Sequence, residues 1–300
     1  MIISQRLRPA CYLCQKVPES AMFDWLAYDF MQRALVASSI LSISIAPVGV
    51  FLVLRRLSLA GEAMAHAIVP GIVIAFVAFG LSVISMITGG MIAGIVVALA
   101  TSMLARRTLI REDGSLASLY LIALALGIFI LSAAGSAVPL KSFLFGSALG
   151  IGDDTLVLIG VIATITLFSF AIMLRPLISA TFDPVFFETQ SRHLGLVQQW
   201  FMFLLVLNLL AAFKSLGTLM AVGLMILPAT AARYWVSTIT GYLLLTFIFA
   251  LLSCWAGLIL SFYLSNVPTG PAIVLVAGCI FFISLFCAPL GLLRGSIVRK

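Results

Sequence analysis

Charged residues are scarce in this chain of 300 residues. Only 9% of them are Asp, Glu, Lys or Arg and 63% are hydrophobic, whereas a soluble domain is about 25% charged. This composition excludes an ordinary soluble enzyme and a disordered chain. The net charge of +7 comes from 17 basic and 10 acidic residues, too few for the continuous basic face that nucleic acid requires. Because the apolar residues form runs long enough to cross a hydrocarbon layer of about 30 Å, we predict a membrane protein.

Motifs for disulfides, nucleotides and hydrolysis are also missing. The five cysteines form no disulfide framework, and the C-x-x-C of Cys11 and Cys14 has no second Cys or His pair to complete a metal site. No G-x-x-x-x-G-K-S/T or G-x-G-x-x-G motif occurs, so any coupling to ATP must come from another chain. Neither of the two histidines is placed for a Ser-His-Asp triad, which argues against an intramembrane protease.

Long apolar runs occupy most of the chain. In lipid the backbone must satisfy its own hydrogen bonds, and these runs are much longer than the strands of a membrane β-barrel, so they are predicted to be helices. We therefore expect an all-α fold, a polytopic transmembrane helical bundle of eight or nine spans within residues 31–292. The nine candidate stretches are roughly 34–54, 61–80, 83–105, 116–138, 155–174, 196–213, 216–232, 241–264 and 272–290.

Basic residues near the ends of the spans predict the orientation, because they concentrate on the cytoplasmic side. One assignment places eleven of them there and leaves only Lys141 and Lys214 on the opposite side. It puts the C-terminus in the cytoplasm, with residues 293–300 as a tail. The eleven are Arg55, Arg56, Arg106, Arg107, Arg111, Arg175, Arg192, Arg233, Arg294, Arg299 and Lys300.

The amino-terminal segment disagrees with this orientation. Nine spans with a cytoplasmic C-terminus require an external N-terminus, yet the first 33 residues carry Arg6, Arg8, Lys16 and Arg33. Either one weak span is re-entrant or the native start lies later. We expect residues 1–30 to be a leader and favour a native start at Met22.

One carboxylate falls inside a predicted span, where ionisable groups are costly and usually functional. Glu62 is followed four residues later by His66, so the two share one helical face. Carboxylate and imidazole are ordinary ligands of Zn²⁺ and Mn²⁺, and a second copy from a facing subunit would bring two ligands to four. The open alternative is that Glu62 bonds to His66 or caps the helix. Pro70 and Gly71 are predicted to break this helix near mid-membrane, as transporters do beside substrate sites.

A polar interruption spans residues 176–199. Asp183 before Pro184 is typical of the start of a short helix, and Gly195 is typical of a helix end. Phe186 and Phe187 lie beside charged residues between them. This pattern favours a helix that docks on a cytoplasmic partner, and an inert amphipathic connector is the alternative.

Four segments together resemble a known family. The family is that of the membrane permeases of metal-uptake ABC transporters, the ABC-3 permease family, and the resemblance covers roughly residues 30–290. The segments are LRRLSLAGEAMAHA at 54–67 followed by PG at 70–71, FGS at 145–147 with LG at 149–150, GTL at 217–219 with PATAAR at 228–233, and PTGP at 268–271.

The resemblance implies a function and a set of partners. In such permeases two subunits, identical or paralogous, form the pathway, an extracytoplasmic protein delivers the metal, and cytoplasmic ATP-binding subunits drive alternating access. The chain would then be no enzyme, would hold no permanent cofactor, and would carry Zn²⁺ or Mn²⁺, or else Fe²⁺, across a bacterial plasma membrane.

The resemblance also assigns residues. The family's metal-contacting acid and histidine correspond to Glu62 and His66, with Glu in place of the usual Asp, and its coupling helix corresponds to residues 182–195, beginning at Phe182. Asp153 and Asp154 at the outer edge are weaker candidates for docking the binding protein or attracting cations, because exposed acids are usually just solvated.

Two other classes of protein compete with this interpretation. A proton-coupled secondary metal carrier should show several intramembrane carboxylates and an inverted repeat, and the sequence shows one such carboxylate. A non-transporting membrane anchor explains the spans and the docking segment, but it does not explain Glu62 with His66 beside Pro70 and Gly71.

Overall fold

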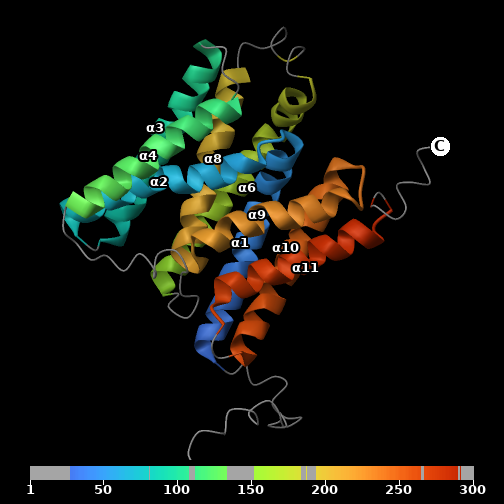
Figure 1. The fold of residues 1–300 in the computed structure, drawn as a ribbon. Coiled ribbons are helices and arrows are strands. Elements are labelled where there is room, and N and C mark those ends of the chain that lie inside the picture. Colours follow the sequence, from blue (N-terminus) through green and yellow to red (C-terminus); the bar gives the residue numbers. More distant parts are fainter. Residues whose placement is uncertain are drawn as a thin grey trace, which may run out of the picture.

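Helices are the only regular secondary structure in the described part of the chain. The computed structural model describes residues 28–80, 82–107, 112–133, 152–183, 187, 194–264, 267–289 and 291. The predicted all-α bundle is confirmed within these residues (Figure 1). The helices are α1 (Asp29–Leu54), α2 (Ser58–Phe79), α3 (Val83–Arg107), α4 (Glu112–Ala133), α6 (Asp153–Phe182), α8 (Leu194–Leu216), α9 (Thr218–Arg233), α10 (Ile239–Tyr263) and α11 (Thr269–Cys287).

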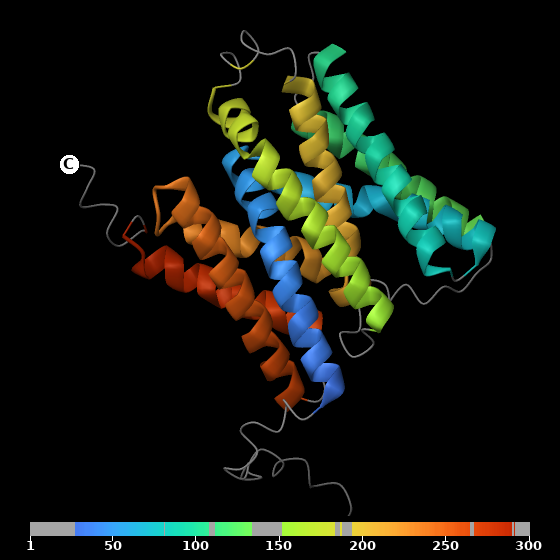
Figure 2. The same cartoon turned by 180° about the vertical axis from the view of Figure 1, so that it is seen from behind.

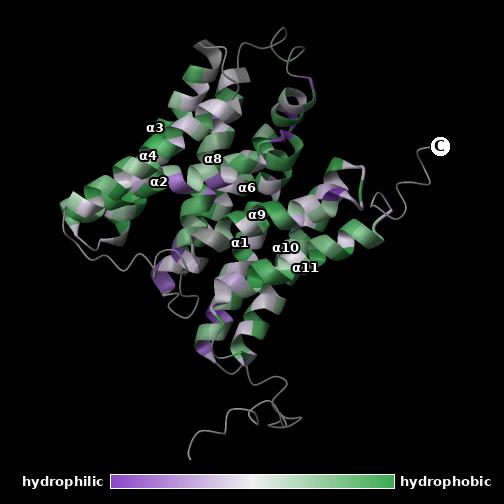
Figure 3. Cartoon of the chain, in the orientation of Figure 1, coloured by the Kyte–Doolittle hydropathy of each residue, from purple (hydrophilic) through white to green (hydrophobic). Residues whose placement is uncertain are grey.

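Most of these helices suit a bilayer. Seven are long and apolar enough to cross it, and apolar stretches of α4 and α9 are shorter. Hydrophobic residues cover most of the helical length, with hydrophilic residues mainly near the helix ends and within α2 (Figure 3). Of the predicted leader, residues 1–30, the part up to residue 27 lies outside the described residues, and Asp29 and Phe30 belong to α1.

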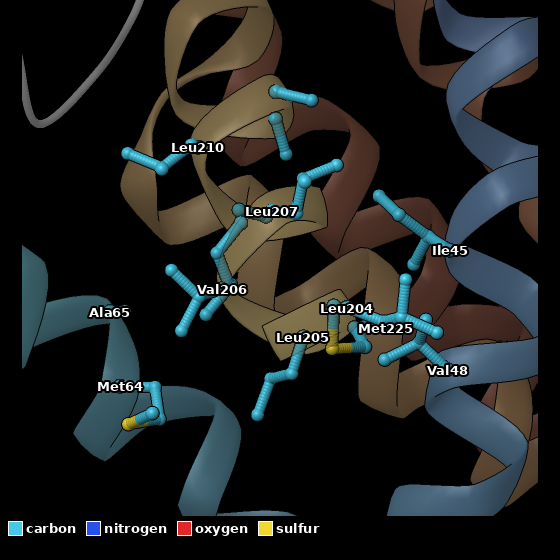
Figure 4. Close-up of a cluster of buried hydrophobic side chains, with 14 of the residues drawn as sticks. Ile45, Val48, Met64, Ala65, Leu204, Leu205, Val206, Leu207, Leu210 and Met225 are labelled. Carbon is cyan, nitrogen blue, oxygen red and sulfur yellow. The ribbon is translucent and has the colours of Figure 1, made fainter. Parts of the chain in front are cut away.

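The helices form two groups around a central set. Helices α2, α3 and α4 pack together on one side, and α9, α10 and α11 pack together on the other. Helices α1, α6 and α8 contact one another between these groups (Figures 1 and 2). Apolar side chains fill the junction of α1, α2, α8 and α9, including Ile45, Met64, Leu205 and Met225 (Figure 4).

A small polar cluster joins the three central helices. Asn208 of α8 donates to Thr166 Oγ1 of α6 at 2.9 Å, and Ser44 of α1 donates to Asn208 Oδ1. All three side chains are buried. Buried polar groups in a membrane protein need partners, so this cluster fixes the relative position of α1, α6 and α8.

Contacts between remote residues define the two ends of the bundle. Arg33 pairs with Asp153 at 3.2 Å, and the Tyr28 and Phe262 rings lie 5.7 Å apart, so α1 and α6 begin at the end where α10 finishes. We call this the Asp153 end. At the other end, called the Arg55 end, Arg55 Nε donates to Thr181 Oγ1 at 3.1 Å. The first described residue thus lies at the end opposite Arg55.

The predicted helix break at Pro70 and Gly71 is wrong. Helix α2 continues through both residues, because α3 and α4 pack closely around this turn. A Cβ on Gly71 would lie 2.6 Å from Ala93 Cβ of α3, and one on Gly127 of α4 would lie 3.1 Å from Pro70 Cα. Such close packing compensates for the hydrogen bond that proline removes. The Pro-Gly pair is therefore a helix-packing site.

Candidate metal site and coupling segment

Glu62 lies on α2 just after the corner that joins α1 to α2. It is the fifth residue of the helix, and α2 has no acidic residue in its first turn and no side-chain cap. Its side chain is exposed, and within the described residues it forms no hydrogen bond or ion pair, with His66 or any other group. The alternative in which Glu62 caps the helix or bonds to His66 is therefore not observed.

His66 lies one turn further along α2 and is half-buried. Its ring stacks on Tyr120 of α4, with centroids 6.2 Å apart and planes inclined by 28°. The contact restricts the imidazole on one face and follows from the close packing of α2 on α4. Sequence reasoning missed Tyr120, because its only signal was a single phenol in an apolar span.

Glu62 and His66 have no third ligand beside them within the described residues. No group of three or more His, Cys, Asp or Glu side chains within the described ranges is arranged to hold a metal ion. An exposed carboxylate on a membrane helix is costly unless it faces water or another protein surface. The arrangement can therefore bind a cation firmly only where a further surface supplies more ligands.

The acidic pair at the start of α6 lies at the Asp153 end. Both carboxylates are exposed, and the helix N-terminus favours their negative charge. Asp153 is paired with Arg33, which offsets its charge. Any attraction of cations to this end therefore depends more on Asp154.

The predicted coupling segment is described in part. Phe182 ends α6 and is 62% exposed, whereas Phe187 is half-buried and packs against the main core. The Phe187 N–H donates to the Asp183 carbonyl at 3.1 Å, and Gly195 is the second residue of α8. Pro184 and Phe186 lie outside the described residues. Of the two described aromatic residues, Phe182 is the one available to a partner.

The fold and these residues define a multi-pass helical membrane protein in which Glu62 and His66 lie on one candidate span, α2. The chain belongs to the ABC 3 transport family, whose family model matches residues 27–288. It is therefore a membrane subunit of a transport system.

Relatives and a solved structure agree with this assignment. The chain is 32% identical to the manganese transport system membrane protein MntC of Halalkalibacterium halodurans, over 88% of this chain and 89% of that protein. It is 30% identical to the manganese import system permease protein ScaB of Streptococcus parasanguinis, over 87% and 92%. The structure of PsaBC from Streptococcus pneumoniae in complex with Fab matches with a TM-score of 0.78 and 28% identity, over 89% of this chain and 96% of that one.

Proposed function

We propose that this chain is the permease subunit of an ATP-driven importer of divalent transition-metal cations, with Mn²⁺ as the preferred cargo over Zn²⁺ or Fe²⁺. The observation that carries the proposal is the exposed Glu62 one helical turn before His66 on a membrane span, in a family of transport proteins. The names of two relatives, MntC and ScaB, favour manganese. Carboxylate and imidazole suit this metal as ligands.

A second permease subunit completes the proposed site. With α2 of each subunit facing the pathway, two carboxylates and two imidazoles surround one cation. In this arrangement the exposed Glu62 carboxylate faces water or protein. It then avoids lipid, in which an ionisable side chain is energetically costly. The partner subunit is either identical or paralogous to this chain.

Separate subunits supply energy and cargo. The sequence has no nucleotide-binding motif, so cytoplasmic ATP-binding subunits hydrolyse ATP and press on the coupling segment at the Arg55 end. An extracytoplasmic metal-binding protein delivers the cation at the Asp153 end. The bundle then alternates between outward-open and inward-open states, in the plasma membrane and with the C-terminus in the cytoplasm.

Uptake by the whole complex in proteoliposomes tests this function. Mn²⁺ uptake should require ATP and should exceed that of Zn²⁺ and Fe²⁺ in competition. The Glu62→Gln and His66→Ala variants should lose at least about tenfold in uptake, because each removes a ligand. Asp29→Asn is the matched control, since it removes an exposed carboxylate at the start of α1.

Two results would contradict the proposal. Wild-type uptake by both the Glu62→Gln and His66→Ala variants would remove the metal pathway from α2. Uptake driven by a proton gradient without ATP would favour the secondary carrier.

A further inference from the structure

Arg55 contacts both helices that flank the coupling segment. Its Nε donates to Thr181 Oγ1 at 3.1 Å, and its Cζ lies 5.1 Å from the centroid of the Phe201 ring. Thr181 immediately precedes Phe182 at the end of α6, and Phe201 lies in the second turn of α8. The coupling segment connects these two helices. One half-buried side chain therefore holds both of its attachment points.

Arg55 also opens the corner between α1 and α2, the helix that carries Glu62 and His66. Only three residues, 55 to 57, separate α1 from α2, and the Leu57 N–H donates to the Leu52 carbonyl at 2.9 Å. Arg56 has a φ of 59°, a conformation that residues other than glycine seldom adopt. The corner is thus short and internally hydrogen-bonded. A displacement of Arg55 must move the beginning of α2.

The chemistry of the contact requires arginine. A guanidinium group can donate a hydrogen bond in its plane while its face lies on an aromatic ring. The ammonium group of lysine has no such plane. Phe201 is 1% exposed, so the guanidinium group lies over a ring that is itself buried in the core.

We propose that Arg55 is a positioning residue that transmits movement of the coupling segment to Glu62 and His66. The proposal rests on the proposed function. Binding of the ATPase moves the ends of α6 and α8, Arg55 moves with Thr181 and Phe201, and the three-residue corner carries this displacement into α2. When the contact is lost, ATP hydrolysis continues, but the metal site no longer responds to movement of the coupling segment.

The test is a parallel measurement of ATP hydrolysis and Mn²⁺ uptake by the whole complex in proteoliposomes. In the Arg55→Met variant the rate of Mn²⁺ uptake should fall about tenfold, while the rate of ATP hydrolysis stays within about twofold of the wild type. A tenfold effect lies in the range of coupling free energies between two sites of one protein. The number of ATP molecules used per Mn²⁺ then rises about tenfold. Arg55→Lys should restore only part of the coupling. Arg233→Met, which removes an exposed arginine in the last turn of α9, away from this corner, is the matched control and should stay coupled.

Two smaller changes test the same contact without removing the charge. Thr181→Val removes the acceptor and Phe201→Leu removes the ring, and each should raise the ratio of ATP to Mn²⁺ less than Arg55→Met does. Because the three residues act as one unit, combining either change with Arg55→Met should add no further uncoupling. If Arg55→Met prevents assembly, these two variants decide the question by themselves.

Several outcomes would overturn the inference. A proportional loss of uptake and hydrolysis, or an unchanged ratio in all three variants, would leave Arg55 a structural residue. A wild-type complex that shows no ATP-dependent metal uptake would instead refute the proposed function. If the wild-type complex transports Mn²⁺ and the Arg55→Met variant uses no more ATP per Mn²⁺ than the wild type, only the role of Arg55 is refuted.

Discussion

His66 of α2 packs against a residue of another helix, since its imidazole stacks on the Tyr120 ring of α4. Under the proposed function His66 binds the cation, and the loss of a group that orients a metal ligand weakens binding strongly. We expect Tyr120→Ala to weaken Mn²⁺ binding to the assembled complex about tenfold. Tyr120→Phe keeps the ring and should bind almost as the wild type does.

Equilibrium binding of Mn²⁺ to the detergent-solubilised complex, followed by electron paramagnetic resonance, measures this effect. Equal affinities of the Tyr120→Ala and Tyr120→Phe variants would show that the ring contact does not orient His66.

A second prediction at the scale of single residues concerns the contribution of Asn208 to the stability of the folded chain. Replacing Asn208 with Ala leaves the buried hydroxyls of Ser44 and Thr166 without their shared partner. Because partners in the membrane are hard to replace, we expect a loss of about 1–2 kcal/mol. Ser253→Ala is the control, since the Ser253 hydroxyl donates to the Phe249 carbonyl of its own helix. Unfolding of both variants in mixed detergent micelles gives the difference, and equal stabilities would contradict the prediction.

At the scale of whole helices, the approach of α2 to α3 depends on small residues. A methyl group at Gly71 would meet Ala93 Cβ and the Gly89 backbone, and overpacking of this kind costs about 1–3 kcal/mol. Gly71→Ala should therefore lower stability by this amount. Gly160→Ala on α6 meets no atom within 4 Å and should be neutral. Thermal unfolding in detergent measures both, and an equal effect at the two positions would argue against close packing at Gly71.

Hydropathy predicted where most helices lie. The stretch 241–264 corresponds to α10, which the structure gives as Ile239–Tyr263, and 83–105 corresponds to α3. The prediction for 155–174 was too short, because α6 continues through Arg175 and Pro176 to Phe182. Both this error and the one at Pro70 have one cause. A proline lowers the helix propensity of a segment, and a charged residue lowers its hydropathy. Whether the helix continues there depends instead on how neighbouring helices pack against it.

The sequence also predicted that Glu62 and His66 lie on one helix, and the structure places both on α2. Glu62 and His66 were identifiable because four-residue spacing on a helix needs no tertiary information. Tyr120 and the contacts of Arg55 with Thr181 and Phe201 were not, since they join residues far apart in the chain. Such contacts arise only from the packing of whole helices.

At the scale of the whole molecule, the two ends of the bundle make a topological prediction. We expect the Asp153 end to face the outside and the Arg55 end to face the cytoplasm, because basic residues follow the cytoplasmic side. In a background with the native cysteines replaced by serine, an impermeant maleimide should label the Asp154→Cys variant on intact cells. The Arg56→Cys variant should be labelled only after permeabilisation, and the reverse pattern would invert the proposed orientation.

The exposed carboxylate on α2 should also affect how cells accumulate this protein. Under the proposed function a second subunit covers Glu62, so a newly inserted chain without that partner leaves an ionisable group exposed on a membrane helix, which is costly. Such an orphan subunit should be a substrate for membrane proteases. The abundance of this chain should therefore follow the abundance of its partner, and overproduction of one subunit alone should yield a short-lived protein.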